Sequence, residues 1–159
     1  MEVRTGMPYA QFVTALEKAA PPLDTWAFEL IAESGGTWDD VRAAMEENAP
    51  HHLIRYWRLN GTQVLKLAGG TTRSMEYLIG NHVIAESMFR HDPRALLYAP
   101  LRMMVWSDEN DRAVFAMHRP SDEFGSLGNA GVTKVGEMLD RYVIALLHEC
   151  GVSAERDFA

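Results

Sequence analysis

The stretch MEYLIGNHVIAESMFRHDPRALLYAPLRMMVW, residues Met75–Trp106, decides the fold. Its apolar segment Tyr77–Ile79 ends at a glycine, and Asn81 then occupies the position of a helix N-cap, where its side chain can accept a hydrogen bond from a free amide. The following helix turns its apolar residues to one side: Val83, Ile84, Met88 and Phe89. Leu101–Trp106 is rich in β-forming residues. The stretch therefore predicts strand, helix and strand, with polar groups at the first strand-to-helix turn.

Composition predicts one soluble domain. The chain has 159 residues, of which 47% are hydrophobic and 23% charged, enough to bury a sizeable core. The net charge of −7 and the scattered basic residues argue against a nucleic-acid partner. The single Cys150 excludes an intrachain disulfide and is expected to be buried and inert. No signal peptide or membrane span is predicted, so the expected location is cytoplasmic, with no membrane partner.

Upstream of Met75, periodicity predicts five elements in order. Met7–Ala20 is an amphipathic helix, and Trp26–Glu33 is a strand that Gly35-Gly36 ends. Thr37 caps a helix over Trp38–Asn48. Leu53–Leu59 is a strand, which a short helix over residues 62–68 follows.

Downstream of Trp106, the pattern predicts a sheet closed by a long helix. Ala113–His118 is a strand antiparallel to Leu101–Trp106, and Pro120–Gly131 is a loop. Val132–Cys150 forms the last helix, with one apolar stripe, and the final nine residues are expected to be frayed. About five strands and about four helices define an α+β domain, a sheet packed by helices on one face.

The motifs Tyr-Leu-Ile-Gly-Asn-His, Leu-Tyr-Ala-Pro-Leu-Arg-Met-Met-Val-Trp and Ala-Met-His-Arg-Pro-Ser, read in this order, resemble those of the DUF302 family, which has a TT1751-like fold. The resemblance covers roughly Trp26–Cys150. It implies a two-layer, mainly antiparallel β-α-β(4)-α core, usually homodimeric, and it brings no established activity. It also implies that residues 1–25 are an added N-terminal helical extension, residues 26–150 the domain, and residues 151–159 a tail.

The chain departs from this family pattern at two places. His82 stands where many members have proline after the asparagine, and the cysteines that some members carry near these motifs are absent. Thiol-based or thiolate–metal chemistry is therefore not expected here.

His82 is the leading candidate for chemistry. At the first turn of a helix its cationic form is disfavoured by the helix dipole, so a neutral imidazole is expected, which can act as base, metal ligand or hydrogen-bond partner. Glu86, one turn later, could orient it. The alternative is an exposed His–Glu pair with no role beyond the helix surface.

Four further residues are candidate ligand-binding groups. Asn81 lies beside His82, and Tyr56 could line a pocket, although strand aromatics are usually core. Arg102 and His118, on neighbouring strands, could meet a small anion, or could be ordinary edge residues.

No metal ligand is assigned, because the histidines lack the spacing typical of metal sites. Haem with His82 or His118 as axial ligand stays open, but covalent c-type attachment is excluded because no CxxCH sequence exists. The cofactor is therefore unknown.

Three functions remain as hypotheses. The first is a homodimeric small-molecule-binding domain, with a pocket between the sheet and the helix over residues 81–90, or at the dimer interface. The second is an enzyme that uses His82 as general base, oriented by Glu86, on a small organic substrate. The third is a protein-interaction or regulatory module without a pocket.

Overall fold

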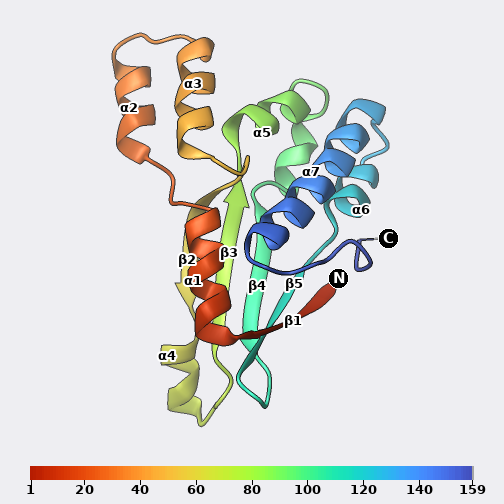
Figure 1. The fold of residues 1–159 in the computed structure, drawn as a ribbon. Coiled ribbons are helices and arrows are strands. Elements are labelled where there is room, and N and C mark those ends of the chain that lie inside the picture. The colour runs from red at the N-terminus through yellow and green to blue at the C-terminus, as the bar shows by residue number, and fades with distance from the viewer. Residues whose placement is uncertain (159) are drawn as a thin grey trace.

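The computed structural model describes residues 1–158 and contains one five-stranded antiparallel sheet of order β1-β5-β4-β3-β2 (Figure 1). The strands are β1 Glu2–Pro8, β2 Ile54–Asn60, β3 Ser74–Gly80, β4 Leu101–Ser107 and β5 Arg112–Met117. The helices are α1 Tyr9–Ala19, α2 Thr25–Glu33, α3 Trp38–Asn48, α4 Thr62–Leu65, α5 His82–Phe89, α6 Pro120–Gly125 and α7 Ala130–Glu149, with short 3-10 helices η1 Lys66–Ala68 and η2 Pro93–Leu97. The predicted α+β class is confirmed.

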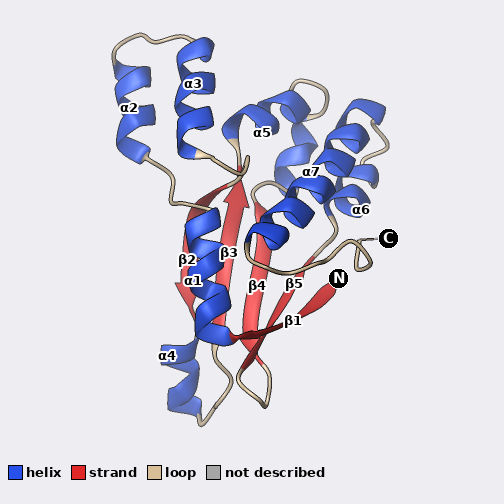
Figure 2. Cartoon of the chain, viewed as in Figure 1, coloured by secondary structure: helices blue, strands red, loops and turns tan. Residues whose placement is uncertain are grey.

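Helices and sheet form two layers, with α1 and α7 lying across the sheet (Figure 2). Strand β4 shows how the layers form: Leu101, Met103 and Val105 are buried, while Arg102 and Met104 between them are exposed. Such alternation is expected of an antiparallel sheet that is covered on one side. On the covered side, Phe12 of α1 meets Phe115 of β5 edge to face, with ring centroids 6.4 Å apart. We call the opposite side of the sheet, on which the Met104 side chain lies, the outer face.

Most predicted elements are present. Thr37 caps α3 in a capping box with Asp40, and α5, α7 and strands β2 to β5 lie where the sequence places them. The order implied by the family resemblance, one strand, helix, four strands and helix, is also confirmed. Its first strand is β1, however, and not the predicted strand Trp26–Glu33.

The prediction of a strand over Trp26–Glu33 is wrong, because these residues form α2. A short apolar run fits either structure, and here the N-cap decides: the Asp24 side chain accepts a hydrogen bond from the amide of Ala27. Partly buried Phe28 and Ile31 lie about one turn apart on the helix.

The N-terminal segment was expected to be only helical. Residues 2–8 instead form an edge strand, in which Val3 pairs with Phe115 of β5 and is buried. Residues 1–25 therefore contribute both β1 and α1 to the common sheet and core. The edge strand was missed because only one of its residues is fully buried.

Two C-terminal predictions also fail. Part of the predicted loop Pro120–Gly131 is α6, which begins with proline at its first position, carries Asp122 and Glu123 in its first turn and buries Phe124. The predicted frayed tail is wrong for residues 151–158, since Val152 and Ala154 pack into the core, and Ala159 lies outside the described residues.

Candidate functional site

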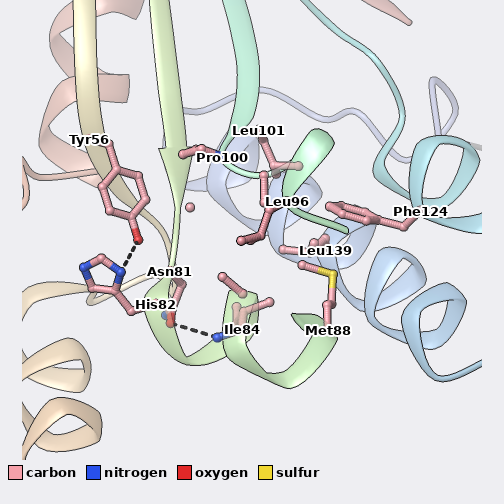
Figure 3. A pocket seen from close by; sticks show the side chains of 13 residues that line it. Tyr56, Asn81, His82, Ile84, Met88, Leu96, Pro100, Leu101, Phe124 and Leu139 are labelled. Atoms are coloured by element: carbon pink, nitrogen blue, oxygen red, sulfur yellow. Dashed lines mark hydrogen bonds between the residues drawn. The ribbon is translucent and has the colours of Figure 1, made fainter. Parts of the chain in front are cut away.

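A partly open cavity of about 210 Å³ lies between the end of the sheet and α5 (Figure 3). Its walls come from seven elements: strands β2, β3 and β4, the short helix η2, and helices α5, α6 and α7. The apolar side chains around it include Ile84, Met88, Leu96, Leu101, Phe124 and Leu139. Of the described residues, Tyr56, Asn81 and His82 are the ones that bring polar side chains to the cavity.

The β3–α5 turn positions these polar groups. The Asn81 side-chain oxygen accepts hydrogen bonds from the amides of Val83 and Ile84 at 2.8 and 3.2 Å, so it caps α5 as predicted. Its Nδ2 donates to the carbonyl oxygen of His52 at 2.9 Å. Because both ends of the Asn81 amide are engaged, the turn is fixed and His82 becomes the first residue of the helix.

Tyr56 reaches the site through an irregularity in β2. The register between β2 and β3 shifts between Arg55 and Trp57, which leaves Tyr56 at a bulge. A bulge re-aims a side chain relative to a regular strand. Gly80 admits the re-aimed ring, because a Cβ at this position would lie 3.0 Å from Cε2 of Tyr56.

The Tyr56 hydroxyl lies 3.2 Å from Nδ1 of His82 (Figure 3). The Phe28 ring of α2 packs edge-on against the imidazole, with centroids 5.0 Å apart. Burial lowers the pKa of His82, and burial also raises the pKa of Tyr56. Both groups are therefore neutral near pH 7. The expected neutral His82 thus has burial as its main cause, where the sequence suggested the helix dipole.

Two hydrogen-bonding patterns are open to this neutral pair. Either the Tyr56 O–H donates to Nδ1, or Nδ1–H donates to the phenolic oxygen and the O–H proton turns elsewhere. In the second pattern the hydroxyl can donate to a molecule in the cavity. The pair can thus accept or donate one hydrogen bond without carrying charge.

Glu86 does not form the expected pair with His82. Its carboxylate pairs with Arg90, one turn further along α5. The partner of His82 is Tyr56, from a different part of the chain.

Arg102 and His118 lie outside the cavity, in a separate hollow of about 360 Å³. The two hollows share only Ala99 and Pro100 as lining residues. Arg102 pairs with Glu76 at 3.1 Å and His118 with Glu123 at 3.3 Å, and their side chains are 75% and 85% exposed. The structure therefore brings together Tyr56, Asn81 and His82, but not the other three candidates.

The sequence identified part of the apolar walls of the cavity. Ile84 and Met88 lie on the apolar side of the predicted helix, and Leu101 and Leu139 lie in a predicted strand and helix. Phe124 lies within a predicted loop, and Leu96 lies between predicted elements, so neither could be assigned to the cavity. Among residues 1–158, no group of three or more His, Cys, Asp or Glu side chains is arranged to hold a metal ion. The haem alternative stays a prediction.

The fold and site define an α+β domain with one apolar cavity beside the turn that follows its third strand. Residues 32–146 match the family model described as "Domain of unknown function DUF302". Since the match covers more than half of the sequence, the chain belongs to the DUF302 family.

A solved structure supports the fold. The chain is similar to the crystal structure of an uncharacterized conserved DUF302 protein from Bacillus stearothermophilus, with a TM-score of 0.66 and 12% sequence identity. The similarity covers 94% of this chain and 96% of that one. No curated protein matches the sequence. At this identity the comparison establishes the fold alone.

Among residues 1–158, no helix has the length and hydropathy needed to cross a bilayer. The cytoplasmic location stays a prediction.

Proposed function

We propose that the chain binds a small, neutral and mostly apolar molecule in the cavity between the sheet and α5. The observation that carries this proposal is the combination of apolar walls with the single Tyr56–His82 pair. Ligand sites are typically apolar with a few convergent polar groups that fix orientation.

The absence of charge in the cavity lining defines the ligand class. Of the described residues that line it, none is Lys, Arg, Asp or Glu. A carboxylate or ammonium group would lose its hydration there without gaining an opposite charge, which is costly. An alcohol, ketone or amide needs only one hydrogen bond, which Tyr56 can supply.

The size of the cavity limits what it can enclose. An apolar cavity of about 150 Å³ holds a benzene ring, so 210 Å³ suits a group slightly larger than benzene. Benzyl alcohol is a suitable probe, and toluene is its counterpart without the hydroxyl.

Calorimetric titration of both probes tests the proposal. Wild type should bind both probes. Tyr56→Phe should lower the affinity for benzyl alcohol by about 3–10-fold, which is the contribution of one neutral hydrogen bond, and should leave the affinity for toluene unchanged. Tyr98→Phe is a matched control, because the Tyr98 hydroxyl lies 3.3 Å from Ser126 Oγ outside the cavity. Absence of binding by wild type would contradict the proposal.

The Tyr56–His82 hydrogen bond also supports a second candidate, acid–base catalysis on a small organic substrate. A neutral imidazole can take a proton, and a phenol bonded to it can give one. In this version Tyr56 replaces Glu86 as the partner of His82. If a turnover assay is found, unchanged kcat in both His82→Ala and Tyr56→Phe would remove this mechanism.

We further propose that the chain forms a homodimer through the outer face of the sheet. The same face could serve the third hypothesis from the sequence, a protein-interaction module. This face exposes Trp57, Leu59 and Met104 at 44%, 47% and 43%. It also carries both signs of charge, with Glu76 beside Arg102. In a two-fold interface the same patch meets itself, so a patch with both apolar and oppositely charged groups can be self-complementary.

A further inference from the structure

A third and more open hollow shares lining residues with the cavity. This groove, about 520 Å³ in volume, runs between α3 and α5, and its lining includes Phe28, Trp38, Val41 and Phe89. Three residues, His82, Ala85 and Leu96, line both the cavity and the groove. Among the described residues, these three are the lining that the cavity and the groove have in common, so the two hollows are neighbours.

The groove is apolar and unusually exposed. Trp38, Phe89 and Leu96 keep 38%, 46% and 47% of their surface accessible. Contiguous exposed apolar surface of this kind usually marks a binding site. The one charged group in the lining, Glu86, is already paired with Arg90.

The cavity alone is small for a ligand site. Such sites typically enclose about 300–1,000 Å³, more than the 210 Å³ available here. The adjoining groove can supply the remaining contact area, and its chemistry continues that of the cavity.

We infer that the ligand is an elongated neutral molecule with an apolar chain, one end of which fills the cavity while the rest lies along the groove past His82, Ala85 and Leu96. The inference rests on the proposed function and specifies its ligand class. A polar group at the end that fills the cavity is within reach of the Tyr56–His82 pair, which lines the cavity. An aliphatic alcohol longer than the cavity is the simplest molecule with these properties.

Chain length provides the test. Wild-type protein is titrated with 1-hexanol, which the cavity can enclose, and with 1-decanol, which it cannot. Each buried methylene contributes about 0.8 kcal/mol, or about fourfold in affinity, so 1-decanol should bind at least tenfold more tightly. Both should bind with one molecule per chain.

Variants locate the extra methylenes. Phe89 and Trp38 line the groove and not the cavity. Phe89→Asp and Trp38→Asp should therefore each lower the affinity for 1-decanol at least fivefold and change the affinity for 1-hexanol less than twofold. Leu97→Asp is the matched control, because Leu97 is an exposed apolar residue that lines the separate hollow beside Arg102 and neither the cavity nor the groove. It should change neither affinity.

The two proposals fail differently. If wild type binds 1-hexanol but 1-decanol gains nothing, or if the groove variants affect both alcohols equally, the inference is overturned and the cavity proposal survives. If neither alcohol binds wild type, both proposals are overturned.

Discussion

The protonation of His82 follows from its immediate neighbours. Its ring lies between Tyr56 and Phe28, and burial lowers its pKa. A histidine that is harder to protonate in the folded chain stabilises the fold above the unfolded pKa of about 6.5. That stability is lost as the pH falls from this value through the folded pKa.

We therefore expect the His82 ring signals to titrate below pH 6.5 in a proton NMR experiment. Phe28→Ala should raise the pKa toward its ordinary value, because the ring becomes more hydrated. In urea unfolding, replacing His82 with Gln should reduce the loss of stability between pH 7 and pH 5. A wild-type His82 that titrates at or above 6.5 would contradict this account.

At the scale of an element, α5 depends on its cap. Asn81→Ala removes an acceptor for two amides and the donor to His52, and should lower the free energy of unfolding by at least about 1 kcal/mol. Asn81→Asp should lose less, because a carboxylate still caps the helix. Urea denaturation measures both changes.

Asn129 provides the control for this prediction. It caps α7 in the same way, accepting from the amides of Gly131 and Val132. Asn129→Ala should lower the free energy of unfolding by a similar amount without lowering the affinity for benzyl alcohol. Asn81→Ala should lower this affinity as well, because Asn81 sets the position of His82. Equal effects on benzyl alcohol would contradict a specific role for the β3–α5 turn.

Glu17 and Glu86 form ion pairs that differ in what they contribute to the fold. Glu17 of α1 accepts hydrogen bonds from Arg58 at 2.7 and 2.9 Å and from the Tyr77 hydroxyl at 3.1 Å. It also lies 3.4 Å from Arg55, whose side chain is only 13% exposed. Glu86, by contrast, forms a surface pair with Arg90 within one helix.

Glu17→Gln should therefore destabilise the fold by about 2–3 kcal/mol, because a mostly buried arginine loses its counter-charge. Glu86→Gln should cost less than about 0.5 kcal/mol and leave the His82 titration unchanged. Thermal unfolding and the NMR titration test the pair. A shifted His82 titration in Glu86→Gln would restore the orienting role suggested by the sequence.

For the whole molecule, the outer face of the sheet predicts an oligomer. Native mass spectrometry should show a dimer, and Met104→Lys with Leu59→Lys should weaken it at least tenfold by burying like charges. Leu67→Lys, on the equally apolar but separate η1 turn, should not. A monomeric wild type at micromolar concentration would contradict the proposed interface.

Much of the architecture could be predicted because it rests on local signals. The Asn81 cap, the alternation along β4 and the apolar stripe of α7 are each encoded within a few turns of chain. The secondary structure of residues 26–33 could not be predicted in this way, because a short apolar run suits helix and strand alike. The residue that decides for a helix, the N-cap Asp24, lies before the run.

The site was less predictable than the fold. His82 and Asn81 could be found because they adjoin a recognisable turn. The contact between His82 and Tyr56 depends on a bulge in β2, which no pattern in the sequence predicts. Phe124 lies in α6, a helix within a segment that the sequence predicts to be a loop. Arg102 was separated from the site by strand alternation, which turns its side chain to the outer face.

The most direct test of the proposed cavity site is a crystal structure of the protein soaked with 4-bromobenzyl alcohol. We expect anomalous bromine density among Met88, Phe124 and Leu139, with the hydroxyl within hydrogen-bond distance of Tyr56. Bromine density only at other sites, with the cavity empty at a concentration that saturates binding in solution, would contradict it.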